Sequence, residues 1–292
     1  MIYDVRHVTT YGYSRMVPFA RCILRLLPRD EPGQRVENGE ILITPRPAER
    51  SDGLCFFGNH MTMISVTRPH RELRVEMRAR ITVERAAPPH PGLTRGWEEV
   101  AALALASASL EPSSPAHHLY PSRLVPAVAP VVAYARESFP AGRPVLEAAS
   151  ELMGRIRRDF TYDPDATEVS TPLAEAFAAR HGVCQDFAHI MIAGLRGLGL
   201  PAAYVSGYIR TIPPPGQKRL EGADASHAWA TIWCGPEIGW IGLDPTNDLI
   251  VGDDHIVTAI GRDYADVSPL DGVLIGPGSQ KIAVAVDVIP VG

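Results

Sequence analysis

The feature that most constrains this chain is the run Leu73–Val83, in which apolar and polar residues alternate for eleven positions. Alternation with a period of two predicts a strand in an antiparallel sheet, with one face on a core and the other in solvent. Shorter runs of the same kind, separated by turn-forming clusters at 28–33, 45–53 and 58–59, are found at Ile2–Val8, Glu40–Thr44 and Met61–Val66. Because short amphipathic strands bury their apolar faces against one another, we predict an N-terminal antiparallel β-sandwich domain over residues 1–88.

The pattern changes from strands to helices after the proline-rich segment 86–91, which we interpret as a linker. Helical spacing then predicts helices at 97–108, within 128–139, at 144–160, after Thr171 and at 184–198. Alternation returns in the last third and predicts strands at 203–210, 227–234, 239–243 and 281–288. Helices followed by antiparallel strands are typical of an α+β domain. We expect it to span 89–292, with a helical part at 92–200 and a β part at 201–292.

The composition of the 292 residues is that of an ordinary globular protein and argues against several function classes. With a formal net charge of −5, we expect neither nucleic acid nor a membrane as a partner. The N-terminus lacks the pattern of a signal peptide, and no apolar stretch is long enough to span a bilayer. The four cysteines form no C-x-x-C pair, which favours a reducing compartment, the cytoplasm by default. No pattern indicates the oligomeric state.

One cysteine, Cys184, stands at the predicted start of an apolar helix, directly after a Gly-Val turn. A thiol at a helix N-terminus lies at the positive end of the helix dipole, which favours the nucleophilic thiolate. Two predicted strands follow, with His227 at the start of the first and Asp244 at the end of the second. If these strands are neighbours, the imidazole can deprotonate the thiol and the carboxylate can orient the imidazole. The backbone N–H of Cys184 is a candidate oxyanion donor.

The same cysteine also has a purely structural explanation, because a lone cysteine is a common small core residue. Spacing alone leaves both interpretations open. The other three cysteines, Cys22, Cys55 and Cys234, are expected to be inert, and Cys234 falls on the strand face opposite His227.

Five segments together resemble the bacterial transglutaminase-like superfamily, whose members are often described as cysteine proteases. They are Phe160–Pro164, Gly182–His189, Gly199–Tyr208, Asp224–Trp229 and Gly239–Asn247. The resemblance covers nearly the whole chain, and its first 86 or so residues resemble the β-rich N-terminal domain of one bacterial branch. It implies a papain-like core in which Cys184 is the nucleophile, His227 the general base and acid, and Asp244 the orienting carboxylate.

Three further residues are candidates for the cleft. Related enzymes often place an aromatic side chain that helps the oxyanion where Tyr162 stands, although Tyr162 could instead anchor its loop. Gln185 could line the cleft or cap the first turn of the helix. Trp229 shares a strand face with His227 and could form a wall of the substrate groove or belong to the core.

We expect no metal and no cofactor. Animal transglutaminases use calcium, but two adjacent acids in the turn Gly252–His255 fall short of a calcium cage, and we interpret this segment as a solvated turn.

The expected reaction is hydrolysis of an amide or peptide bond through a thioester on Cys184, because the chain lacks the additional domains of cross-linking enzymes. One alternative is a protein-glutamine transglutaminase, which passes the acyl group to an amine. The other is a non-catalytic module that binds a partner through the same cleft. The expected partner is a peptide or protein substrate.

Overall fold

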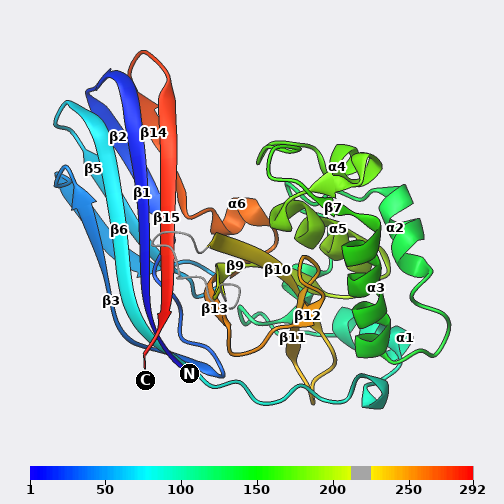
Figure 1. The fold of residues 1–292 in the computed structure, drawn as a ribbon. Helices are drawn as coiled ribbons and strands as arrows, with labels where there is room; N and C mark the ends of the chain where they lie inside the picture. The colour runs from blue at the N-terminus through cyan, green and yellow to red at the C-terminus, as the bar shows by residue number, and fades with distance from the viewer. Residues whose placement is uncertain (212–224, 292) are drawn as a thin grey trace, which may run out of the picture.

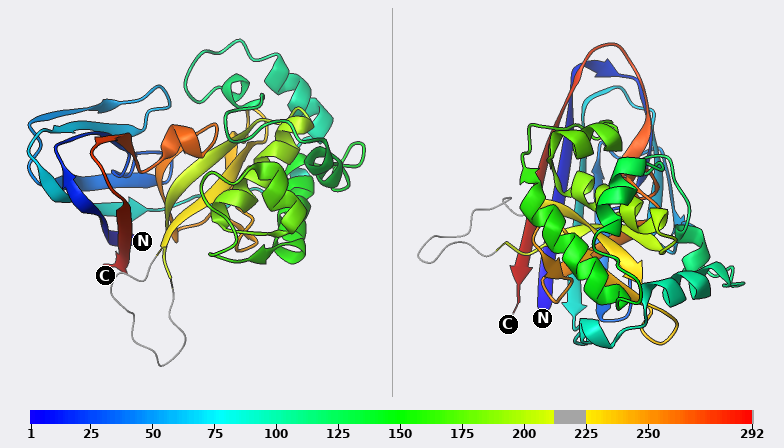
Figure 2. Two further views of the ribbon diagram at one scale, coloured as in Figure 1. Left: turned by 90° about the horizontal axis from the view of Figure 1, so that it is seen from above. Right: turned by 90° about the vertical axis from the view of Figure 1, so that its right-hand side faces the viewer.

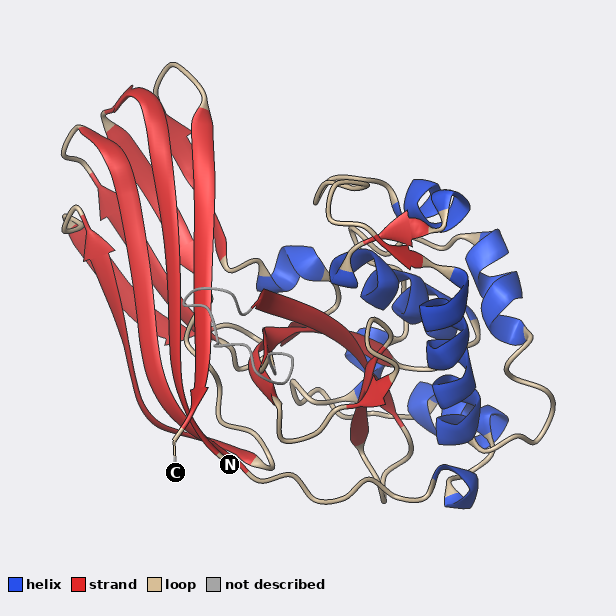
Figure 3. Ribbon diagram, in the orientation of Figure 1, coloured by secondary structure: helices blue, strands red, loops and turns tan. Residues whose placement is uncertain are grey.

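The computed structural model describes residues 1–211 and 225–291, and Figure 1 shows an all-β part beside a mixed part. Figure 3 shows that most helices gather on the side of the molecule far from the all-β part, with a further sheet between, whereas one short helix lies close to the all-β part. The mixed antiparallel architecture agrees with the fold class predicted from the alternating and helical patterns.

The all-β part is a sandwich of two four-stranded antiparallel sheets. In strand order, the first contains β15 (Gln280–Pro290), β1 (Ile2–Val17), β6 (His70–Val83) and β3 (Gln34–Thr44). The second contains β14 (Leu270–Ile275), β2 (Phe19–Leu24), β5 (His60–Val66) and β4 (Glu49–Leu54). The alternating run that predicted a strand forms β6, whose inward-facing Leu73, Val75 and Met77 are fully buried or nearly so.

The C-terminal strands correct the expected domain boundaries. Residues 270–290 were assigned to the second domain, but β15 pairs with β1 from Tyr3–Pro290 to Tyr13–Gln280, and β14 pairs with β2. The sandwich therefore uses both ends of the chain, which lie close together in Figure 1. The alternation of the tail predicted a strand but could not indicate its partner, because pairing across most of the chain leaves no local signal.

A second difference concerns residues 45–53, which were interpreted as a turn cluster. Most of the segment belongs to β4, an edge strand. Every residue of β4 is exposed, so no apolar alternation marks it as a strand. Its backbone pairing with β5 is what makes it a strand.

The mixed part is built on a five-stranded antiparallel sheet. In strand order it contains β12 (Leu249–Ile250), β11 (Trp240–Asp244), β10 (Ala225–Trp233), β9 (Ala202–Ile209) and β13 (His255–Gly261). The α-helices are α1 (Trp97–Leu105), α2 (Ala129–Arg136), α3 (Val145–Asp159), α4 (Leu173–Ala179), α5 (Cys184–Gly197) and α6 (Tyr264–Val267). Short 3₁₀ turns form η1 (Pro91–Leu93) and η2 (Pro115–His118), and β7 (Thr161–Tyr162) pairs in parallel with β8 (His181–Gly182).

Helix α5 packs against the sheet and is buried along nearly its whole length, from Gln185 to Arg196. Its apolar side chains join Ala228, Ala230 and Ile232 of β10 in the main core. Among the residues that the structure describes, no helix is long and apolar enough to cross a membrane.

The sandwich packs against the opposite side of this sheet, at β9 and β13, as Figure 2 shows from above. Tyr208 and Ile256 belong to the apolar core of the sandwich although they come from the other sheet. The Tyr208 hydroxyl lies 2.9 Å from Nδ1 of His7, and the Tyr3 hydroxyl donates to Asp254 at 2.9 Å. The two parts therefore share a buried interface.

The pairing of the C-terminal strands β14 and β15 with the N-terminal strands leads to a prediction about the isolated N-terminal region. A fragment of residues 1–88 lacks β14 and β15, including Val286 and Val288, which are almost completely buried. We expect this fragment to show no cooperative thermal transition by circular dichroism, because β1 and β2 lose their edge partners. A chimera that joins 1–88 to 270–291 through a flexible linker should recover the transition. Cooperative melting of the fragment alone would contradict this.

Three buried histidines lead to a prediction about acid stability. Burial lowers the pKa of His7 to about 4, of His118 to about 3 and of His189 to about 4. Between about pH 6.5 and pH 4 these histidines are protonated in the unfolded chain but largely neutral in the folded chain. The free energy of unfolding therefore falls as the pH drops. Each shift corresponds to roughly 3 kcal/mol at the acid end of this window.

Replacing His7 with glutamine should remove one of these contributions. Urea unfolding at pH 7.5 and pH 4.5 should show a smaller loss of stability for His7→Gln than for the natural protein. His181 is exposed and provides the matched control, since His181→Gln should leave the loss unchanged. The idea fails if His7→Gln loses as much stability as the natural protein.

Candidate active site

Cys184 is the first residue of α5, as the sequence predicted. Two residues after it, Asp186 closes the helix start by accepting the backbone N–H of Val183 at 2.9 Å. Gly182 makes this approach possible, because a Cβ there would lie 2.6 Å from a carboxylate oxygen of Asp186. The Gly-Val-Cys turn is thus held rigidly, and it presents a partly exposed thiol at the positive end of the helix.

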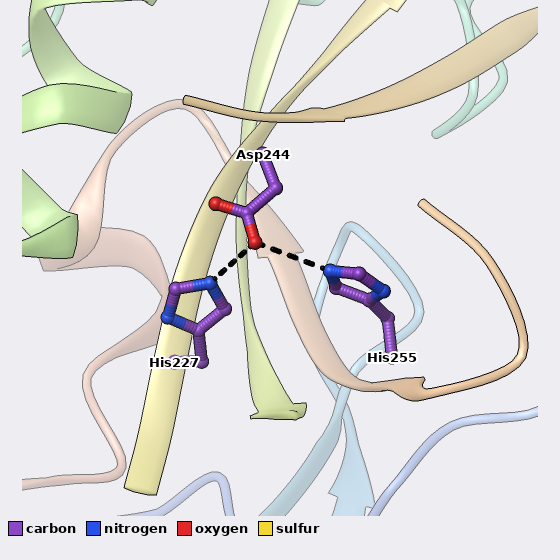
Figure 4. A group of neighbouring side chains, drawn as sticks. All are labelled: His227, Asp244 and His255. Atoms are coloured by element: carbon purple, nitrogen blue, oxygen red, sulfur yellow. Dashed lines mark hydrogen bonds and ion pairs between the residues drawn. The ribbon is translucent and has the colours of Figure 1, made fainter. Parts of the chain in front are cut away.

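His227 and Asp244 come from the neighbouring strands β10 and β11 and meet in the buried interior. Nε2 of His227 lies 2.8 Å from Oδ2 of Asp244, as Figure 4 shows. The side chain of Cys184 also acts on His227, because it contributes together with Asp244 to raising the pKa of the imidazole. The structure therefore brings together the three residues that the sequence analysis selected, although Asp224, at the start of the motif around His227, lies outside the described residues.

The pKa values of His227 and Asp244 favour a charged imidazolium beside a charged carboxylate. Burial by itself lowers the pKa of His227, but hydrogen bonds with Asp244 and Cys184, together with the charges of these groups, outweigh it and raise the pKa to about 10. Burial likewise raises the pKa of Asp244, yet hydrogen bonds from His227 and His255 hold it well below its ordinary value. An imidazolium beside a carboxylate is therefore stable at neutral pH.

Asp244 is fully buried and accepts hydrogen bonds on both oxygens. Its Oδ1 accepts the backbone N–H groups of Thr246 at 3.0 Å and Asn247 at 3.3 Å. Its Oδ2 lies 2.8 Å from Nε2 of His227, 2.7 Å from Nδ2 of Asn247 and 3.2 Å from Nε2 of His255. This set of donors fixes the carboxylate in one orientation.

His255 and Asn247 are residues of this network that the sequence analysis did not select. The segment Gly252–His255 was interpreted as a solvated turn, but His255 is only 2% exposed and begins β13. Figure 4 shows Asp244 between His255 and His227. The local sequence pattern gives no sign of this contact, because β13, which carries His255, is separated in the sheet from β11, which carries Asp244, by β9 and β10. The contact of Asp244 with its own turn could have been found, because an Asp side chain commonly accepts the backbone N–H two residues further on, here that of Thr246.

His227, Asp244 and His255 are also a set that could hold a metal ion, since their ligand atoms lie within 4.8 Å of one another. The hydrogen bonds of His255 indicate that it is a donor to Asp244 and not a metal ligand. The backbone N–H of Gly252 donates to Nδ1 of His255 at 3.4 Å, which places the ring proton on Nε2, facing Asp244. Metal-bound histidines instead donate their second nitrogen to an outer partner.

The three other predicted cleft residues differ in their positions. Tyr162 is 51% exposed and pairs in β7 with Gly182, so it lies beside the turn that carries Cys184. The nearby thiol contributes, after burial, to raising the pKa of Tyr162. Gln185 is buried and donates to the carbonyl of Val169 at 3.3 Å, which places its amide on the neighbouring loop.

Trp229 is 1% exposed, and its ring packs between His227 and His255. It lies so close to β9 that a Cβ on Gly207 would be 2.6 Å from the indole. It also lines a cavity of about 640 Å³ between the sheet and the sandwich. Trp229 therefore packs against the two histidines and also lines a cavity.

Comparisons with known proteins identify the family. Residues 3–82 match the bacterial transglutaminase-like N-terminal region, and residues 133–245 match the transglutaminase-like superfamily. An uncharacterized protein of Mycobacterium tuberculosis is 41% identical over 99% of this chain and 92% of its own length. The chain therefore belongs to the bacterial transglutaminase-like family, as the sequence motifs indicated.

Two further similarities are informative in different ways. The crystal structure of a candidate cysteine protease from Cytophaga hutchinsonii matches with a TM-score of 0.76 and covers 100% of this chain and 92% of its own. At 20% identity this confirms the fold class. A protein-glutamine gamma-glutamyltransferase of Pseudomonas aeruginosa is 33% identical over 103 residues, which are 32% of this chain and 15% of that protein.

The environment of the thiols leads to a prediction about their reactivity. Burial raises the pKa of Cys22 to about 11 and that of Cys234 to about 12, so neither should react at pH 7.5. Cys55 is partly exposed like Cys184 and provides the matched comparison, since it is Cys184 that acts on the pKa of His227. Iodoacetamide should alkylate Cys184 about tenfold or more faster than Cys55, as measured by peptide mass spectrometry.

The difference between the two partly exposed thiols should depend on the histidine. His227→Ala should slow the alkylation of Cys184 and leave that of Cys55 unchanged. Equal rates for all four thiols would show that Cys184 is not activated.

Proposed function

We propose that this protein is a cysteine-dependent acyl-transfer enzyme that cleaves an amide or peptide bond of a peptide or protein substrate. The observation that carries the proposal is the position of His227 between Cys184 and a fully buried, hydrogen-bonded Asp244. Because Nε2 of His227 is engaged by Asp244, Nδ1 is left to exchange a proton with the thiol. This is the arrangement that nucleophilic catalysis by a thiol requires.

In the first half of the proposed reaction, the Cys184 thiolate attacks the amide carbonyl and the carbonyl π electrons move to the oxygen. The backbone N–H of Cys184, at the first position of α5, is the proposed donor to this oxyanion, and Tyr162 lies where it could assist. When the tetrahedral intermediate collapses, the C–N bond breaks and the imidazolium of His227 gives its Nδ1 proton to the leaving amine. The products are a thioester on Cys184 and a free amine.

In the second half, His227 takes a proton from water as the water oxygen attacks the thioester carbonyl. The C–S bond breaks, the carboxylic acid leaves, and the thiolate–imidazolium pair is restored. Asp244 keeps the ring in one orientation through both halves, because its five hydrogen bonds leave it no freedom to rotate.

A second candidate function is transfer of the acyl group from Cys184 to a primary amine. It is favoured by the similarity over 103 residues to a protein-glutamine gamma-glutamyltransferase. The two functions share the thioester and differ only in the acceptor, which depends on how far the cleft excludes water. A non-catalytic binding module is the third possibility, and the Cys184–His227–Asp244 arrangement argues against it.

The reaction can be tested with a peptide library, using mass spectrometry in ¹⁸O-labelled water. We expect new carboxyl termini that carry one ¹⁸O atom, with and without an added primary amine such as dansylcadaverine. Cys184→Ala should abolish cleavage, whereas Cys22→Ala should retain it. His227→Ala should reduce the rate by about 100- to 10,000-fold, as expected for loss of a general acid–base.

The other outcomes separate the alternatives. Incorporation of dansylcadaverine into glutamine side chains, without new carboxyl termini, would favour the transferase. Binding of peptides with neither product would overturn the enzymatic proposal.

A further inference from the structure

We infer that His255 is a positioning residue that holds Asp244 for His227, and that the N-terminal sandwich holds His255 in turn. The inference rests on the proposed function, because it assigns a role within the same site. It connects His255, which lies outside the proposed triad, to the N-terminal sandwich, whose role the sequence does not indicate.

The first support is the direction of the hydrogen bonds at His255. Gly252 donates its backbone N–H to Nδ1, so this nitrogen carries no proton and Nε2 is the donor. Nε2 lies 3.2 Å from Oδ2 of Asp244, the same oxygen that His227 contacts at 2.8 Å. Nε2 of His255 therefore donates to the carboxylate oxygen from the side opposite His227, as Figure 4 shows.

The second support is the packing between the two histidines. They come from strands β10 and β13, which are separated by β9. The ring of Trp229 bridges this separation, with its centroid 5.9 Å from that of His227 and 5.2 Å from that of His255. His255 is 2% exposed and His227 is 7% exposed, so water has little access to replace a lost donor.

The third support is the way the sandwich holds β13, the edge strand of the five-stranded sheet. The side-chain amide of Gln34 donates to the carbonyl of Val257 and accepts its N–H, both at 2.8 Å. Asn59 does the same with Ile260, at 2.8 and 2.9 Å. Each amide replaces a missing neighbouring strand.

Arg85 of the N-terminal domain adds a third contact to this edge, because its guanidinium donates to the carbonyl of His255 itself at 3.3 Å. The edge of β13 is therefore fixed by side chains of the N-terminal domain from His255 to Ile260. The sandwich sets the position of His255, which in turn sets that of Asp244.

In the described part of the chain, three charged or titratable groups contact His255 or its partner Asp244. Asp244 faces Nε2 of His255, His227 lies beyond Asp244, and Arg85 contacts the His255 backbone. The adjacent Asp254 is engaged by Tyr3 and Arg210 instead. A change of the His255 side chain should therefore act on the site through Asp244.

The test compares His255→Leu, which removes the donor, with His255→Gln, whose side-chain amide can restore an N–H toward Asp244. The readout is the second-order rate constant for alkylation of Cys184 by iodoacetamide as a function of pH, which needs no knowledge of the substrate. We expect His255→Leu to lower the rate constant about tenfold at pH 7. The acid midpoint of the profile should move up by about half a unit to one unit, because a less well-oriented Asp244 stabilises the imidazolium less.

His255→Gln should recover most of the rate and return the midpoint toward that of the natural protein. His70→Leu is the matched control, because His70 is also buried and its ring contacts the Arg68 carbonyl and Tyr13, both within the sandwich. It should lower the melting temperature without changing the alkylation profile. Gln34→Leu, which loosens β13, should slow alkylation in the same direction as His255→Leu.

The outcomes separate this inference from the proposed function. If Cys184 of the natural protein is no more reactive than Cys55, the proposed function itself fails. If Cys184 is activated and Asp244→Asn slows it, but His255→Leu leaves rate and midpoint unchanged, only the positioning role is overturned. Equal slowing by His255→Leu, His255→Gln and His70→Leu would also overturn it, since loss of folding stability would then explain the effect.

Discussion

The buried carboxylate of Asp244 is the group on which the arrangement of this site depends. Its exposed fraction is 0%, and a buried carboxylate is tolerated only where hydrogen bonds replace its water. Five N–H groups do so here, two from the backbone of its own turn and three from the side chains of His227, Asn247 and His255. The turn and strands β10 and β13 must therefore all be placed correctly before this charge is stable. The same contacts orient His227 toward Cys184.

This requirement gives the N-terminal sandwich a physical connection to the site. Gln34 and Asn59 pair with the free edge of β13, and Tyr208 and Ile256 extend into the apolar core of the sandwich. The chain also returns to the sandwich at its end, through β14 and β15. The two parts consequently share an apolar core and hydrogen bonds. A sandwich that was free to move relative to the sheet would move β13 as well.

Much of the fold could be predicted from local patterns. The alternation of Leu73–Val83 predicted β6, and the turn before an apolar helix predicted the start of α5 at Cys184. Prediction failed where the pattern is absent or ambiguous. Strand β4 is exposed on both faces and so has no apolar period, and the tail shows a strand but not its partner β1. Backbone pairing at long range is independent of the side-chain pattern that reveals a strand.

The sequence by itself determined the order Cys184, His227, Asp244 and their local settings, because helix starts and strand ends are encoded within a few residues. It could also indicate the family through motifs in the correct order. Only the tertiary structure decided that His255 faces Asp244 and that the two ends of the chain build one sandwich. These contacts join strands that are not neighbours in the chain, and which strands become neighbours is decided by the burial of whole faces against each other.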